Sequence, residues 1–148
     1  MIFREATTND IKQMQIVRNA VSENILSNPD LIKDKDYEVF LTKKGKGWVC
    51  LLENRIVGFA IVDVRTNNIW ALFILPSSEG KGIGRKLQDI MLDWYFTQTQ
   101  TTAWLETGSG TRAEKFYKKT GWLEISTSSV GEVKFEMNYE VWKMKRKI

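Results

Sequence analysis

An unbroken apolar run from Ile69 to Leu75 is the pattern around which the chain is organised. Its length suits a strand buried on both faces and is too short for an independent helix. Pro76 ends the run, because proline has no N–H group to donate to a strand ladder. After a glycine-rich turn, apolar side chains recur with helical spacing at Ile83, Leu87, Ile90, Met91 and Trp94. The pattern predicts a central strand, a turn and a long helix ending at about Thr97.

Shorter apolar runs bounded by turn residues predict further strands. These strands are expected at residues 2–6, 48–52, 56–62, 102–107, 122–126 and 132–139. The basic tail that starts at Lys143 is expected to be solvated and frayed.

Capping residues predict the remaining helices. The segment Thr7–Asp10 offers an N-cap, and apolar residues then continue with helical spacing to Ile25, where Asn28-Pro29 stops the helix. A short helix is expected at residues 37–41. The capping box Thr111-x-x-Glu114 predicts a helix that ends at Gly121.

The composition excludes several classes of function. The 148 residues predict a single domain over residues 1–148, and they contain no histidine and one cysteine. Histidine-based catalysis, a His-ligated metal site and an internal disulfide are therefore excluded, which suits a reducing cytoplasm. A net charge of +4 suits an anionic ligand but is too small to indicate nucleic acid. No signal peptide and no apolar run long enough for a membrane span are present.

The turn Glu79-Gly80-Lys81-Gly82-Ile83-Gly84 is the first candidate binding element. Glycines let the backbone approach an anion, and the first N–H groups of the following helix point at it. The nucleotide P-loop spacing is absent, and Arg85 occupies the position of the third glycine in a dinucleotide fingerprint. The turn instead resembles the acyl-CoA signature (Gln/Arg)-x-x-Gly-x-(Gly/Ala) of the GNAT superfamily of N-acyltransferases. Glu79 departs from its first position.

A second segment strengthens this resemblance. GNAT proteins commonly carry Asn-x-x-Ala-x-x-x-Tyr-x-x-x-Gly-(Phe/Trp), and Ala113, Tyr117, Gly121 and Trp122 match it in register. Gly110 stands in place of the asparagine, so the side-chain contact of that residue with pantetheine does not carry over. Thr111 is a candidate to replace part of it.

The resemblance implies a mixed α/β fold. It would contain a mostly antiparallel sheet of about six to seven strands, a parallel central pair and about four flanking helices. It also implies an acetyl-CoA site in which pantetheine pairs with the open edge of the central strand. The implied cofactor-binding residues are Leu72, Phe73, Ile74, Glu79, Gly80, Lys81, Gly82, Ile83, Gly84, Arg85, Gly110, Thr111 and Tyr117.

The implied chemistry needs an acid and a base. Tyr117 is the candidate general acid, since a phenol with a reference pKa of about 10 is protonated at neutral pH. Its alternative role is packing beside Phe116. Glu106 is the first choice for a base that acts through water, ahead of Asp63 and Glu136, and its alternative is a solvated charge at a strand end.

The predicted activity is transfer of an acetyl group from acetyl-CoA to a primary amine of a small molecule or peptide, without a metal ion. The alternative is a non-catalytic acyl-CoA-binding or sensing domain of the same fold. The sequence also allows the protein to form a homodimer. Candidate acceptor contacts, which are also typical of a solvated loop, are Glu23, Asn24, Ser27 and Asn28. Trp70 and Trp104 are expected either in the core or in the wall of an acceptor pocket.

Overall fold

The computed structural model describes residues 1–21 and 32–146. In chain order its strands are β1 (Ile2–Glu5), β2 (Gly45–Leu52), β3 (Arg55–Asp63), β4 (Asn68–Ile74), β5 (Ala103–Gly108), β6 (Leu123–Thr127) and β7 (Glu132–Met137). These described strands form one seven-stranded sheet in the order β1-β2-β3-β4-β5-β7-β6. Neighbouring strands are antiparallel except for the central pair, β4 and β5, which is parallel. The predicted sheet architecture is confirmed.

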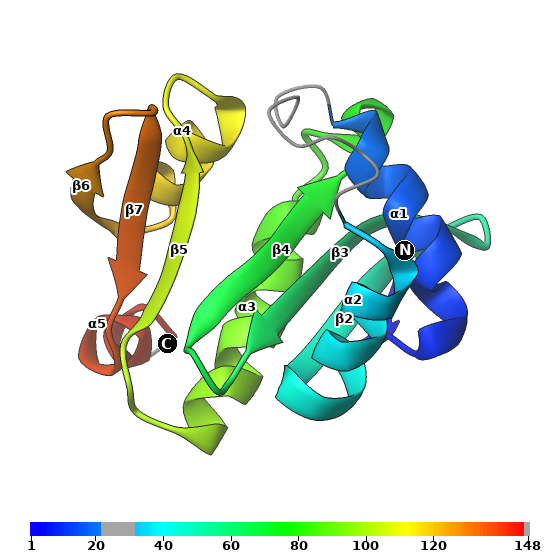
Figure 1. Ribbon diagram of the computed structural model, residues 1–148, viewed down its shortest axis with the longest axis horizontal. Coiled ribbons are helices and arrows are strands. Elements are labelled where there is room, and N and C mark those ends of the chain that lie inside the picture. The colour runs from blue at the N-terminus through cyan, green and yellow to red at the C-terminus, as the bar shows by residue number, and fades with distance from the viewer. Residues whose placement is uncertain (22–31, 147–148) are drawn as a thin grey trace.

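Helices cover both faces of this sheet (Figure 1). The described α-helices are α1 (Ile11–Ala20), α2 (Asp34–Val39), α3 (Ile83–Gln98), α4 (Arg112–Lys119) and α5 (Tyr139–Arg146). Single helical turns of other types are η1 (Thr8–Asp10), η3 (Phe40–Lys44) and η4 (Pro76–Ser78).

Two hydrophobic cores lie on opposite faces of the sheet. The core under α3, α4 and α5 includes Leu87, Met91, Leu105, Tyr117, Phe135 and Trp142. The core under α1 and α2 includes Met14, Val17, Tyr37, Phe59 and Ala71. The long strand β3 contributes to both, because successive side chains point to opposite faces. Buried on both faces, the centre of the sheet is a rigid support for the residues at its open edge.

Helix α1 starts where the sequence predicts and ends earlier. The Thr7 N–H donates to Asp10 Oδ2 at 2.8 Å, and the Asp10 carboxylate also accepts two hydrogen bonds from Arg4. The helix stops at Ala20, where the Val21 N–H donates to Arg18 O at 3.2 Å and Val21 is extended. The prediction of one continuous helix toward Asn28 was therefore wrong at Val21, and residues 22–31 lie outside the described part of the chain.

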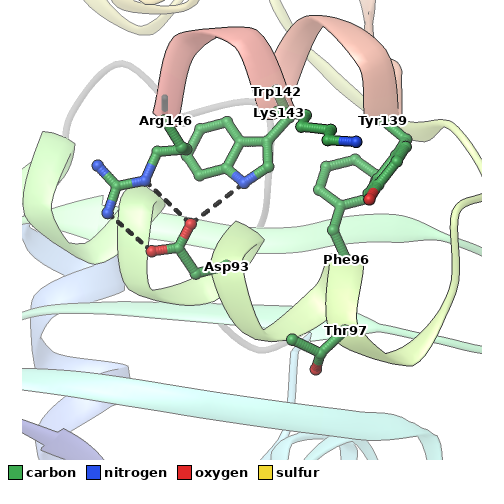
Figure 2. Close-up of a pocket in the computed structure, with 7 residues that line it drawn as sticks. All are labelled: Asp93, Phe96, Thr97, Tyr139, Trp142, Lys143 and Arg146. Atoms are coloured by element: carbon green, nitrogen blue, oxygen red, sulfur yellow. Dashed lines mark hydrogen bonds and ion pairs between the residues drawn. The ribbon is translucent and has the colours of Figure 1, made fainter. Parts of the chain in front are cut away.

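The tail is a helix, so the expectation of a frayed end was wrong over the described residues. In α5, Trp142 is only 4% exposed and its Nε1 donates to Asp93 on α3. Arg146 pairs with the same carboxylate at 2.8 Å, and Phe96 and Tyr139 line a shallow pocket beside them (Figure 2). The prediction rested on the basic residues from Lys143 onward. It overlooked Trp142, whose buried side chain holds α5 against α3.

Candidate active site

The parallel strands β4 and β5 are joined only near the start of β4. Asn68 pairs with Trp104, the Trp104 N–H donates to Asn67 O at 2.9 Å, and Trp104 Nε1 donates to Thr66 O at 2.8 Å. Toward its end, β4 pairs with β3 alone among the described strands, and β4 and β5 diverge (Figure 1). The predicted pantetheine-binding residues Leu72, Phe73 and Ile74 therefore lie on an open strand edge.

A β-bulge in β4 explains why the strands part. Ile61 pairs with Ala71, whereas the next residue, Val62, pairs with Ile69. Trp70 is thus an extra residue in β4. A bulge bends the strand and increases its local twist, which turns the following residues away from a neighbour. The bulge follows directly after the Asn68–Trp104 pair.

The glycine turn leads into α3 without a side-chain cap. Gly80 and Gly82 both have φ of +79°, a conformation that favours glycine, and Gly82 is the N-cap of α3. Because no side chain caps the helix, its first N–H groups are available to an anion. Gly84 packs close to Phe116, where a Cβ would meet ring atoms at ordinary contact distance, 3.6 Å.

Positive side chains surround this helix start. Lys81, Arg85 and Lys86 are exposed. Glu79, the departure from the family motif, forms an ion pair of 3.0 Å with Arg112 at the start of α4. The pair links the two helix starts and compensates the carboxylate that the sequence places close to the expected phosphates.

Helix α4, in contrast, is capped by its own side chains. Thr111 Oγ1 accepts from the Glu114 N–H at 3.2 Å and donates to Gly108 O at 2.7 Å. Glu114 Oε1 accepts from the N–H of Gly110, whose φ is +77°. The predicted helix start at Thr111 is confirmed, but the return hydrogen bond of a capping box is shifted, because Glu114 accepts from Gly110 and Thr111 is the N-cap. A contact of Gly110 or Thr111 with pantetheine stays a prediction.

Tyr117 projects from α4 into the core under α3. It is 6% exposed, and its ring packs against Phe116, Trp122 and Phe135. Burial raises the pKa of its phenol above the ordinary value, so the hydroxyl is protonated at any physiological pH. Packing beside Phe116 is therefore observed, whereas the role of Tyr117 as a general acid stays a prediction.

Glu106 lies on the other face of β5. Leu105 belongs to the core under α3, and the alternation of side chains turns Glu106 toward the opposite side, where it is exposed. Its register partner on β7 is Lys134. Asp63 is 4% exposed and caps a turn, accepting from Arg65 N–H at 2.8 Å and from the Thr66 hydroxyl at 2.9 Å. Tyr117 and Glu106 thus belong to opposite faces of the sheet beside the open edge.

Sequence reasoning missed Arg18. This residue of α1 places its guanidinium carbon 5.6 Å from the ring centre of Trp70 and 4.9 Å from that of Phe73. The only feature of the sequence that could have indicated Arg18 is its place on α1, directly after Val17 and one helical turn after Met14, which are apolar. Trp70 contributes to the core under α1 and α2. The acceptor candidates at positions 23, 24, 27 and 28 lie outside the described residues.

Two classes of site find no support in the described part of the chain. No described helix is long and apolar enough to cross a membrane. The described residues also contain no group of three His, Cys, Asp or Glu side chains that could hold a metal ion.

A β-bulge, an open edge on the central strand and an uncapped helix start after a glycine turn lie together at this candidate site. The sequence profile of the Acetyltransferase (GNAT) family matches residues 12–122, so this chain belongs to that family. Among curated proteins, none is significantly similar in sequence.

Solved structures share the fold at low identity. PaiA N-acetyltransferase from Thermoplasma acidophilum in complex with coenzyme A aligns with a TM-score of 0.81 at 13% identity, over 93% of this chain and 98% of that one. An N-acetyltransferase from Staphylococcus aureus Mu50 aligns with a TM-score of 0.79 at 14% identity, over 93% and 98%. The ribosomal-protein-S18-alanine N-acetyltransferase from Escherichia coli gives 0.72 at 17% identity, over 92% and 90%.

Proposed function

We propose that this protein transfers an acetyl group from acetyl-CoA directly to a primary amine of a small molecule or peptide. The observation that carries the proposal is the open edge of β4 beside the uncapped start of α3. Pantetheine, a chain of amides, would pair with the backbone of Leu72, Phe73 and Ile74, and the pyrophosphate would accept from the first N–H groups of α3.

The open edge also supplies a group for the transition state. Attack of the amine converts the thioester carbonyl into an oxyanion. A β4 backbone N–H directed at that oxygen would stabilise the developing charge, and a positioned donor of this kind is worth about 10²–10³-fold in rate. This donor is a backbone N–H, so it does not depend on which side chain the residue carries. Its direction is set by the bend of β4 at the Trp70 bulge.

Tyr117 is the proposed donor to the departing sulfur. A thiol has a reference pKa of about 8.5, well below that of a phenol. Burial raises the phenol pKa further, so complete proton transfer to the thiolate would be uphill. The hydroxyl would therefore act mainly as a hydrogen-bond donor while the tetrahedral intermediate collapses, at the lower end of the usual contribution of a general acid.

Glu106 is the proposed base on the acceptor side. Its carboxylate is exposed and would accept a proton from the ammonium form of the substrate through water. Because Tyr117 of α4 lies on one side of the sheet and Glu106 of β5 faces the other side, the two groups would reach the reacting centre from opposite sides.

The test is a titration followed by a turnover assay. Acetyl-CoA at 100 times its Kd should raise the free energy of unfolding by about 2.7 kcal/mol, seen as a higher melting temperature. A panel of amines should then release thiol from acetyl-CoA. A melting curve that millimolar acetyl-CoA leaves unchanged would sink the proposal. Stabilisation without release of thiol by any amine would favour the acyl-CoA-binding domain without catalysis.

A further inference from the structure

Three buried polar atoms on the α1 and α2 side of β4 are not used by the proposed chemistry. They are Gln15 Oε1, Arg18 Nη1 and the hydroxyl oxygen of Tyr37. None makes a hydrogen bond of ordinary geometry with a described residue, although the Arg18 guanidinium lies near enough to the Tyr37 hydroxyl to act on the pKa of that phenol. Buried polar groups are nearly always satisfied, and an unmatched charged donor is the most costly kind. Arg18 therefore calls for an explanation beyond packing.

Aromatic rings hold the guanidinium of Arg18 in place. The group lies over Phe73 and Trp70 of β4. Trp70 is itself fixed, because Phe40 stacks on it at 4.0 Å between ring centres and Tyr37 meets it edge-on at 5.1 Å. Stacking on aromatic faces orients a guanidinium while its N–H groups stay able to donate in the plane.

The electrostatics of this cluster favour an anion. Arginine is always charged. Burial raises the pKa of Tyr37 to about 12, and Arg18 offsets that effect only in part, so Tyr37 is a neutral donor. Asp34, the carboxylate that also acts on Tyr37, forms an ion pair with Lys12 at 2.8 Å. The positive charge of Arg18 therefore has no carboxylate of its own among the described residues.

The cluster adjoins the proposed reacting centre. Phe73 contributes its backbone to the open edge of β4 and its ring to the wall that carries Arg18. An amine that attacks a thioester held at this edge from the α1 and α2 side would approach past Phe73, over whose ring the Arg18 guanidinium lies.

We infer that Arg18 determines acceptor specificity: it binds a carboxylate on the acceptor, which is an amino acid or another small amine with a carboxylate. This inference rests on the proposed transfer to an amine. The planar fork of arginine matches a carboxylate with two parallel hydrogen bonds, and Tyr37 adds a third donor. A phosphate ester, with a charge of about −1.5 to −2, would exceed the single positive charge of this aromatic wall.

The experiment compares matched acids and amides. The twenty standard amino acids and their carboxamides are titrated calorimetrically into the protein saturated with CoA, which carries no acetyl group to transfer. At least one acid should bind at least about tenfold more tightly than its amide, as expected for a charged hydrogen-bonded pair. In Arg18→Gln this ratio should fall to within about twofold of one.

Two further variants keep the result interpretable. Lys35→Gln removes a positive charge from α2 at an exposed side chain and leaves the Lys12–Asp34 ion pair intact, so it should retain the acid preference. Arg18→Lys keeps the charge but loses the fork, so its ratio should be intermediate, and it replaces Arg18→Gln if that variant does not fold. Comparing ratios between variants also cancels the difference in amine pKa between an acid and its amide.

The outcomes separate this inference from the proposed function. Equal binding of acids and amides by the wild-type protein, or a preference that survives in Arg18→Gln, would overturn the role of Arg18. If acetyl-CoA binds and amines are acetylated in either case, the transferase proposal stands without it. If CoA does not bind, the transferase proposal fails, and an Arg18-dependent acid preference measured without CoA would still support the carboxylate site.

Discussion

Two helices start beside the open edge of β4, and they start differently. At α3 the N-cap is Gly82 in a left-handed conformation, without a side chain that accepts from the first turn. At α4 the Thr111 hydroxyl and the Glu114 carboxylate occupy those positions. Helix starts attract anions through unpaired N–H groups. From this difference we expect the phosphates of CoA at the start of α3, whereas α4 is expected to present Tyr117.

The largest expected effect comes from filling the start of α3. Gly82→Asp places a negative side chain beside the expected pyrophosphate, so acetyl-CoA affinity should fall by at least about 100-fold, the loss of roughly two charged hydrogen bonds. Calorimetric titration gives the Kd. Gly131→Asp is the matched control, because Gly131 also has positive φ, +80°, and a Cβ there would meet nothing within 4 Å. Equal affinities of the two variants for acetyl-CoA would show that the start of α3 does not bind the pyrophosphate.

The next effect tests what α4 contributes. Tyr117→Phe keeps the ring that packs on Trp122 and Phe135 and removes only the hydroxyl. We expect kcat to fall by about 10²-fold, with the Kd of acetyl-CoA nearly unchanged. Tyr139→Phe removes a phenol from the α5 pocket and should leave kcat as it is (Figure 2). A kcat of Tyr117→Phe within about twofold of wild type would assign Tyr117 to packing.

The same contrast separates what local sequence predicts from what it does not. Strand, glycine turn and helix around Pro76 are encoded by residues that are neighbours in the chain, and the N-cap at Thr111 lies within one helical turn of Glu114, from whose N–H it accepts a hydrogen bond. Both were predicted because periodicity and capping act over a few residues. The resemblance to the family then implied a mostly antiparallel sheet with a parallel central pair, and the strand order became visible only in the structure.

Features that depend on distant contacts were not predictable. The aromatic wall around Arg18 is formed by α1, α2 and β4, and none of these segments carries a signal for the others. The bulge at Trp70 is likewise visible only in the register with β3. At the tail, Trp142 becomes an anchor because Asp93 of α3 lies opposite it. Periodicity in a segment shows which face is buried and not what covers it.

A smaller effect concerns the 3′-phosphate of CoA. Exposed cations near the two helix starts, Lys81, Arg85, Lys86, Arg112 and Lys115, are expected to include its partners. Exposed pairs contribute about 0–1 kcal/mol each, so dephospho-CoA should bind about three- to tenfold more weakly at low salt, and added salt should narrow the gap. Comparing Lys81→Gln with Lys115→Gln shows which helix start is responsible. Equal affinities for CoA and dephospho-CoA at low salt would contradict the prediction.

Removing the cap of α4 should affect stability more than ligand affinity. Thr111→Ala loses the acceptor for the Glu114 N–H and should lower the free energy of unfolding by about 1 kcal/mol. For a domain of this size the melting temperature should fall by about 2–4 °C. Thr111→Ser keeps the hydroxyl and should restore most of the stability. A loss of acetyl-CoA affinity as large as that of Gly82→Asp would show that the start of α4 also holds the phosphates.

The smallest effect is a pH dependence that only α4 should show. Its cap includes the titratable Glu114, whereas the start of α3 has no titratable cap. An ion pair with Lys118 and the hydrogen bond from the Gly110 N–H lower the pKa of Glu114 below its ordinary value. A lowered folded-state pKa means that the contribution to stability is complete above the unfolded pKa of about 4.3 and is lost as pH falls through the folded value.

The amide resonance of Gly110 should therefore shift with an apparent pKa below about 4.3, and the shift should vanish in Glu114→Gln. Because Gly82 has no such carboxylate, its amide should stay unchanged over the same range. A matching titration at Gly82 would mean that the starts of the two helices are coupled, for example through the Glu79–Arg112 ion pair, and do not act as separate sites.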